Sequence, residues 1–174
     1  MHADATLEEA TLAPAVIDIE ASGFGRGSYP IEVGFVLPDG EAWCSLVRPE
    51  PGWLHWDPSA ARVHGITQEC LLSHGRSCRE IAELLNQRLR GLTVYTDGWA
   101  HDYSWMGRLY EAADLLPSFR LDNLFVLLDE ARLAHWDATR QALALRLQLQ
   151  RHRASADARV LQETVRQLSQ QPLR

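Results

Sequence analysis

Three closely spaced apolar segments near the start of the chain constrain its fold more than any other feature. Residues 15–21 (AVIDIEA), 31–38 (IEVGFVLP) and 41–49 (EAWCSLVRP) are short and rich in apolar and β-branched residues, which is typical of strands. Asp39 and Gly40 stand between the second and third segments, and this dipeptide favours a tight hairpin turn. Because all the connections are short, the sequence predicts a three-stranded antiparallel meander.

The rest of the chain alternates between helical and strand patterns. Residues 143–149 alternate strictly, as a strand would, but they are strong helix formers and are assigned mostly to a helix. Ser155 is expected to cap the last helix. The patterns predict helices over 77–91, 101–114, 123–133, 137–147 and 155–171, and strands over 92–97 and 119–125. They therefore predict a single α/β domain over 14–174, with a mixed five-stranded sheet whose meander is followed by parallel strands, after a flexible segment 1–13.

Composition excludes several classes of protein. The apolar runs are shorter than the roughly 18 residues that cross a bilayer, and the N-terminus lacks the basic and apolar regions of a secretory signal. Cys44, Cys70 and Cys78 are widely spaced and form no Cys-x-x-Cys pair, which indicates reduced thiols rather than a disulfide framework or a zinc site. We therefore expect a cytoplasmic protein with no membrane contact.

Charge is distributed unevenly along the chain. The net charge is −6, yet residues 1–139 hold 10 arginines against 21 acidic residues, whereas residues 140–174 hold seven arginines against two. An acidic body with a basic C-terminal end can contact a polyanion at one place and repel it elsewhere. A helix with solvated arginines is the plainer interpretation of the same pattern.

Asp18 and Glu20 are the first candidate functional residues. Side chains alternate along a strand, so both carboxylates point to one face, about 6–7 Å apart. Two partly buried carboxylates this close repel each other, and one is expected to take up a proton unless a divalent cation, which prefers oxygen ligands, binds between them. The alternative is a strand end at which both acids are hydrated.

Asp102, His152 and Asp157 are the other candidates. Asp102 lies near the start of the helix that follows the fourth strand, and His152 precedes Asp157 by five residues at the start of the last helix. Five residues on a continuous helix are about 140° apart, so His152 reaches Asp157 only from the loop before the helix. Each residue also has a plainer explanation, because the helix dipole favours acids in a first turn and a histidine among arginines is typical of a surface.

Together and in this order, these residues resemble the DEDDh family of 3′-to-5′ exonucleases, the DnaQ-like branch of the ribonuclease H-like fold. The first family motif is similar to DIEASGFG (18–25) and the third to HRASADA (152–158), and Asp102 with the apolar pair Trp105 and Met106 is similar to the second. YPIEVG (29–34) and HGIT (64–67) are similar to two further family segments. The resemblance covers residues 14–170 and implies a ribonuclease H-like sheet with helices on both faces.

The second motif departs from the family pattern. Family members usually carry Asn four residues before the Asp and Phe directly before it, where this chain has Gly98 and His101. A shifted alignment would make Asp97 the ligand instead. Asp102 is preferred because Asp97 ends the strand, whereas the family's Asp is on the helix. The departure puts in question how the backbone of a substrate is held.

The resemblance implies a metal-dependent phosphodiester hydrolase. Two Mg²⁺ or Mn²⁺ ions would be bound by Asp18, Glu20, Asp102 and Asp157, with Asp18 bridging, and would activate a water and stabilise the leaving 3′ oxygen. His152 would be the general base. The partner would be a nucleic acid with a free 3′ end, single-stranded DNA or RNA, and the product a nucleoside 5′-monophosphate.

The same resemblance implies substrate contacts outside the acidic residues. Ser22, Gly23 and Phe24 would approach the terminal nucleotide, and His64 would line the pocket. Core packing is the alternative for Phe24, and a structural loop residue is the alternative for His64. Related enzymes suggest a homodimer, and the short chain suggests either a stand-alone enzyme or a subunit recruited by a partner protein.

Two other classes of protein compete with the exonuclease. One is an interaction module on the same fold whose catalysis is lost. The other is a glycosidase with two carboxylates, which leaves His152 and Asp157 unexplained.

Overall fold

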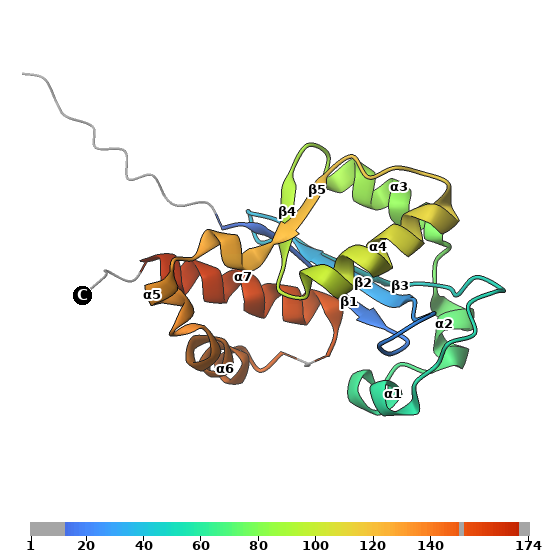
Figure 1. Cartoon of the computed structure of the whole chain (residues 1–174), viewed down its shortest axis with the longest axis horizontal. Helices are drawn as coiled ribbons and strands as arrows, with labels where there is room; N and C mark the ends of the chain where they lie inside the picture. Colours follow the sequence, from blue (N-terminus) through green and yellow to red (C-terminus); the bar gives the residue numbers. More distant parts are fainter. Residues whose placement is uncertain (1–12, 150–151, 171–174) are drawn as a thin grey trace, which may run out of the picture.

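The computed structural model describes residues 13–149 and 152–170, which form a five-stranded mixed sheet with helices on both faces (Figure 1). The strand order is β3-β2-β1-β4-β5, so β1 is central. It pairs antiparallel with β2 and parallel with β4, and thereby joins the meander to the parallel half. The strands are β1 (Ala15–Ala21), β2 (Pro30–Val36), β3 (Ala42–Leu46), β4 (Thr93–Thr96) and β5 (Arg120–Asn123). The predicted fold class is confirmed.

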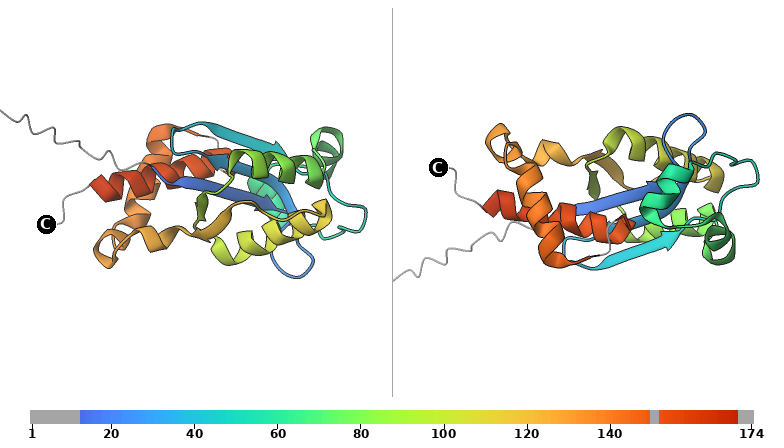
Figure 2. Two further views of the ribbon diagram at one scale, coloured as in Figure 1. Left: turned by 90° about the horizontal axis from the view of Figure 1, so that it is seen from above. Right: turned by 90° about the horizontal axis from the view of Figure 1, so that it is seen from below.

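Helices cover β1 from two sides. α3 and α4 lie on one side and α7 on the other, as Figure 1 and both views of Figure 2 show. The helices are α1 (Pro58–His64), α2 (Gln68–His74), α3 (Cys78–Arg88), α4 (Trp99–Ala113), the 3₁₀ helix η1 (Leu124–Leu127), α5 (Glu130–Leu133), α6 (Trp136–Leu147) and α7 (Ala154–Gln170).

The alternation of β1 divides its side chains between two cores. Ile17 and Ile19 are buried with the side chains of α3 and α4, and Val16 is buried with the apolar side of α7. Asp18 and Glu20 share the face of Val16 because they are two and four residues further along the strand. This face of β1 therefore carries an apolar contact with α7 at Val16 and carboxylates further along the strand, where α7 begins.

Gly34 allows α7 to begin directly against the sheet. It pairs with Asp18 in the register of β1 and β2, and residues opposite each other in an antiparallel pair share a face. An added Cβ would lie 2.6 Å from the carbonyl carbon of Ala154 and 2.8 Å from Cα of Ser155. A side chain at this position would therefore keep the first turn of α7 away from Asp18.

Several predicted boundaries need correction. Ser155 is not the cap of the last helix, because α7 begins at Ala154, whose amide is bound instead by the carboxylate of Glu32 at 2.9 Å. The predicted helix 123–133 is divided into η1 and α5. The alternating segment 143–149 is helical as far as Leu147, as predicted.

Two sequence expectations concern the ends of the chain and membranes. The predicted flexible segment 1–13 lies, apart from Ala13, outside the described residues. Within the described ranges, no helix has both the length and the apolar character that crossing a bilayer requires.

Candidate functional site

Glu20, His152 and Asp157 meet at the start of α7. One potential ligand atom from each lies within 4.8 Å of the others, and all three side chains are partly buried. Glu20 comes from β1, Asp157 from the first turn of α7 and His152 from the loop before that helix. The loop placement is the one that the five-residue spacing requires. His152 has φ 58°, a left-handed conformation that histidine adopts more readily than most residues.

Asp18 is the next carboxylate on the same face of β1 as Glu20, and it interacts electrostatically with the acids around it. Its pKa is raised well above the usual value, first by burial and then by the negative charges of Asp102, Glu20, Asp157 and Asp97. The pKa of Glu20 is raised to about 7, by burial and then mainly by Asp157. The structure therefore places Glu20, His152 and Asp157 together, and it brings Asp18 and Asp102 close enough for their charges to act on Glu20 and on each other.

Asp102 is buried in the first turn of α4, with 3% of its surface exposed. Burial raises its pKa to about 7, against the opposing effect of a hydrogen bond from the Thr96 hydroxyl to its Oδ2. Asp97 is more exposed and lies 3.6 Å from Nη1 of Arg140. A Cβ on Gly98 would lie 3.2 Å from Oδ2 of Asp102, so a side chain at position 98 would adjoin this carboxylate.

This set of donors fits hard divalent cations. Carboxylate oxygens with an imidazole alongside suit Mg²⁺ or Mn²⁺. The pKa values of Asp18, Glu20 and Asp102 are raised first by burial and then by neighbouring negative charges, and a bound cation would favour the ionised forms. The residues present therefore fit the predicted metal chemistry.

An ion pair between the buried Glu32 and the partly exposed Arg153 holds the loop of His152 at this site. Glu32 is fully buried on β2, directly opposite Glu20. Its Oε1 accepts hydrogen bonds from Nε and Nη2 of Arg153 at 3.0 and 2.6 Å, and its Oε2 accepts one from the amide of Ala154. Sequence reasoning gave Glu32 no role. A glutamate within an otherwise apolar strand is the signal that could have revealed it.

Ser22 and Gly23 fix the loop after β1. The Ser22 hydroxyl is buried, accepts a hydrogen bond from the amide of Tyr29 at 3.1 Å and lies 2.9 Å from Nδ1 of His55. Gly23 has φ 138°, and a Cβ there would lie 2.5 Å from Cβ of Asp57. Both residues are thus required by local packing, and their contact with a nucleotide stays a prediction.

Phe24 does not pack in the core, since 69% of its surface is exposed. Its ring lies against His101, with centroids 5.1 Å apart, and against Trp105 at 5.8 Å, while His101 and Trp105 stack on each other. His101 directly precedes Asp102. This aromatic cluster (Phe24, His101 and Trp105) therefore borders the carboxylates and offers a surface on which a planar ring can stack. His101 was not predicted as a site residue.

His64 is buried within the HGIT segment. Its Nδ1 accepts a hydrogen bond from the amide of Ile66 at 3.0 Å, and its Nε2 has no hydrogen-bond partner among the described residues. Burial lowers its pKa, and Glu32 and His152 are close enough to influence that pKa as well. A structural role in the loop is thus observed, and contact with a substrate stays a prediction.

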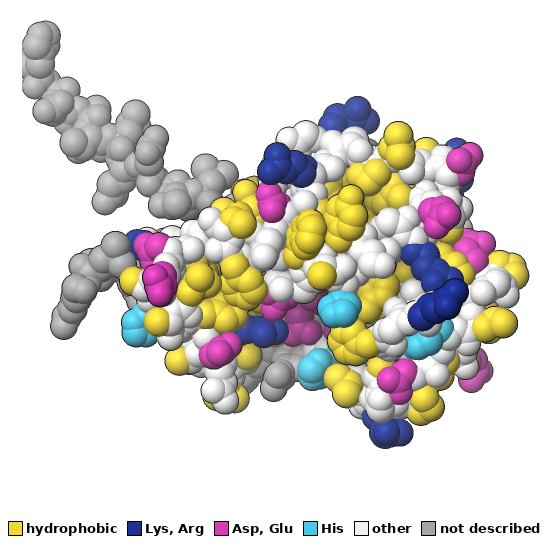
Figure 3. Space-filling view, in the orientation of Figure 1, with side chains coloured by type: hydrophobic (Ala, Val, Ile, Leu, Met, Phe, Trp, Pro, Cys, Tyr) yellow, Lys and Arg dark blue, Asp and Glu magenta, His cyan; other side chains and the backbone are white. Residues whose placement is uncertain are grey.

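Acidic side chains gather at one place on the surface of the molecule. In Figure 3, acidic side chains meet in a hollow at the centre of the face, with histidines beside it and basic side chains on both flanks. A polyanion that reached the acidic centre would therefore meet positive charge on either side.

Comparisons with known proteins support the fold. No family model matches the chain, and no curated protein matches its sequence. Exonuclease I from Methylocaldum szegediense has a TM-score of 0.68 at 16% identity, over 92% of this chain and 41% of that one. E. coli exonuclease I in complex with a 5cy-dT13 oligonucleotide has a TM-score of 0.68 at 14% identity, over 91% and 41%. The zinc-bound form of an E. coli exonuclease I complex with single-stranded DNA has a TM-score of 0.62 at 13% identity, over 87% and 39%. The chain spans about two-fifths of the length of these proteins.

Proposed function

We propose that this chain is a metal-dependent exonuclease that removes nucleotides from the 3′ end of single-stranded nucleic acid. The observation that carries the proposal is the convergence of Asp18, Glu20, Asp102 and Asp157, with His152 among them, on a fold shared with exonuclease I. Complexes of those neighbours with single-stranded oligonucleotides support the choice of substrate. The order of the sequence motifs supports the same reaction.

The four carboxylates would hold two Mg²⁺ or Mn²⁺ ions. When bound, such ions supply a nucleophile at neutral pH and stabilise the charge that develops on a phosphodiester during displacement. The pKa of Asp18 is raised first by burial and then by the charges of Asp102, Glu20 and Asp157.

His152 would take the proton from the attacking water. Imidazole exchanges protons near neutral pH, and His152 lies beside Glu20 and Asp157. The ion pair of Glu32 with Arg153, the next residue, holds this loop in place. Glu32 and Arg153 would thus act as positioning residues for the general base.

The aromatic cluster would receive the 3′-terminal base. Phe24 and His101 are its exposed members, and Phe24 contacts His101 in an edge-to-face arrangement while most of its own surface is open to solvent. Stacking on such a ring is tolerant of base identity. Gly23, whose missing Cβ leaves room for Asp57, would place the backbone of this loop near the terminal sugar.

An interaction module without catalysis is the second candidate. The observation that favours it is the departure at the second motif, where Gly98 and His101 replace the family's Asn and Phe.

Digestion of 5′-labelled single strands of DNA and RNA with Mg²⁺ or Mn²⁺ tests the proposal and separates the two candidates. We expect products shortened one nucleotide at a time, release of nucleoside 5′-monophosphates and inhibition by EDTA. Asp18→Asn should reduce the rate to background, whereas Asp114→Asn, the same change at the far end of α4, should not. No release from any strand, or release that Asp18→Asn leaves unchanged, would refute the proposal.

A further inference from the structure

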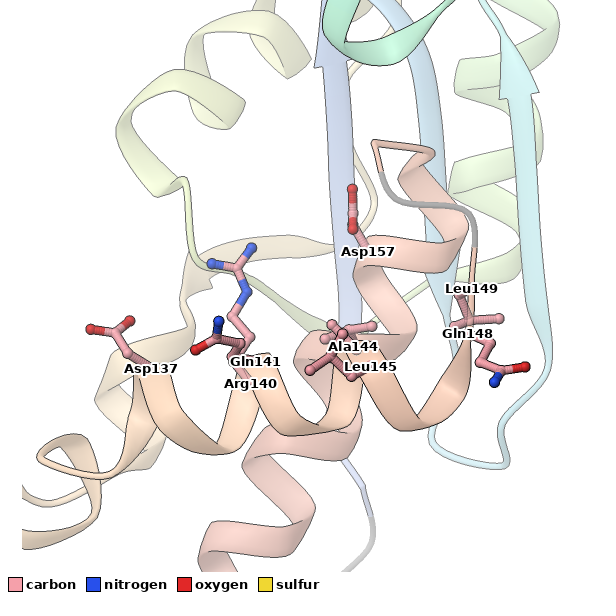
Figure 4. A pocket seen from close by; sticks show the side chains of 9 residues that line it. Asp137, Arg140, Gln141, Ala144, Leu145, Gln148, Leu149 and Asp157 are labelled. Atoms are coloured by element: carbon pink, nitrogen blue, oxygen red, sulfur yellow. The ribbon is translucent and has the colours of Figure 1, made fainter.

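A groove between α6 and α7 opens from Asp157, and its other lining residues have no part in the proposed reaction centre. Its volume is about 580 Å³, within the range of small-molecule sites. Asp157 forms one end, and the rest is lined mainly by α6 and the turn after it (Figure 4). The groove is therefore continuous with the carboxylates.

Arg140 places a positive charge where the groove meets the acidic residues. Its side chain is 42% exposed, and in Figure 4 it projects from α6 toward the same space as Asp157. Its contact with Asp97, at 3.6 Å, is longer than a hydrogen bond. A guanidinium has five N–H donors in a planar fork that matches phosphate oxygens. Arg140 is thus available to an anionic ligand.

The remaining walls combine apolar and amide groups. Leu145 is 75% exposed although it is a large apolar residue, and Leu149 also lines the groove. Gln141 and Gln148 supply amide donors and acceptors. These three kinds of group match the parts of one nucleotide. The apolar surface suits the face of the base, the amides suit its polar edge, and the guanidinium suits its phosphate.

We propose that this groove binds the nucleotide on the 5′ side of the scissile bond, with Arg140 contacting the phosphate of that nucleotide. The inference rests on the proposed function and adds a second subsite to it. The aromatic cluster borders Asp102, whereas the groove borders Asp157, so the two flank the carboxylates. One subsite would hold the departing nucleotide and the other would hold the strand that remains.

Arg140→Gln tests the subsite, with Arg146→Gln as the matched control. Arg146 is an exposed arginine on the same helix and does not line the groove. The substrates are dT8 and the p-nitrophenyl ester of thymidine 5′-monophosphate, in which nitrophenol replaces the upstream strand. Arg140→Gln should lower the ratio of kcat/KM on dT8 to kcat/KM on the ester by about tenfold to a hundredfold, the effect of one charged hydrogen bond. Arg146→Gln should leave the ratio unchanged.

A binding measurement separates failure of the subsite from failure of the proposed function. Fluorescence anisotropy of labelled dT8 is measured against salt concentration on Asp18→Asn protein, with and without Arg140→Gln. Loss of one phosphate contact should reduce the slope of log K against log salt by about 0.7. An unchanged slope, or equal losses of kcat/KM on both substrates, would overturn the subsite. If the wild-type protein hydrolysed no substrate but Arg140→Gln still reduced the salt slope, only the catalytic proposal would be overturned.

Discussion

Replacing Gly34 by alanine would test how the contact between β2 and α7 positions the site. The added Cβ would lie 2.6 Å from the carbonyl carbon of Ala154 and would also meet the backbone nitrogen of Ser155. Ordinary contact begins at 3.4 Å. The first turn of α7 must therefore move by roughly 1 Å, because backbone atoms cannot rotate away as the end of a flexible side chain can.

The displacement has two consequences of measurable size. Overpacking of this kind costs about 1–3 kcal/mol of unfolding free energy, and at this chain length 1 kcal/mol corresponds to about 2–4 °C. The melting temperature should therefore fall by about 2–12 °C. Because α7 carries Asp157, and His152 lies just before it, the same movement misplaces both relative to Asp18 and Glu20. A misplacement near 1 Å can lower a rate by about a hundredfold.

Thermal melts by circular dichroism and the rate of mononucleotide release measure the two effects. Gly52→Ala is the matched control, since a Cβ at Gly52 meets nothing within 4 Å. The account of α7 would be refuted if Gly34→Ala matched this control in both melting temperature and rate.

Three further changes probe other parts of the site. Glu32→Gln should lower the unfolding free energy in urea by about 1–3 kcal/mol, because Arg153 loses a buried charged partner, and should lower kcat more than KM; an unchanged kcat would contradict the positioning role. The pKa of Glu20 is about 7 in the folded protein and 4.5 in the unfolded chain. In EDTA, Glu20 therefore stays protonated in the folded protein over a pH range in which it is ionised in the unfolded chain. The melting temperature should therefore fall as pH rises through this range, and it should fall less in Glu20→Gln. Identical pH profiles of melting temperature in the two proteins would contradict the raised pKa of Glu20. Phe24→Ala should leave unfolding in urea nearly unchanged and weaken binding of a single strand by about 1–3 kcal/mol, measured by anisotropy; unchanged binding would remove the stacking role.

Local patterns in the sequence predicted the parts of the site that depend on one element. The alternation of β1 placed Asp18 and Glu20 on one face, and the five-residue spacing required His152 to lie before the helix; the structure shows both. These predictions succeed because side-chain direction along a strand or helix follows from backbone geometry alone.

Local sequence patterns could not predict contacts between segments that are far apart in the chain. Glu32 and Arg153 are 121 residues apart, and their ion pair replaces the local cap expected from Ser155. The need for glycine at position 34 likewise depends on a helix 120 residues later in the chain. His101 has no local signal for its contact with Phe24, because the loop after β1 and α4 meet only in the folded chain.

The most direct test of the central claim is a crystal structure of the wild-type protein grown with Mn²⁺ and measured for anomalous scattering. We expect anomalous peaks within about 2–2.5 Å of carboxylate oxygens of Asp18, Glu20, Asp102 and Asp157. Carboxylates turned away from one another, with no anomalous peak between them, would contradict the claim that these four side chains form a divalent metal site.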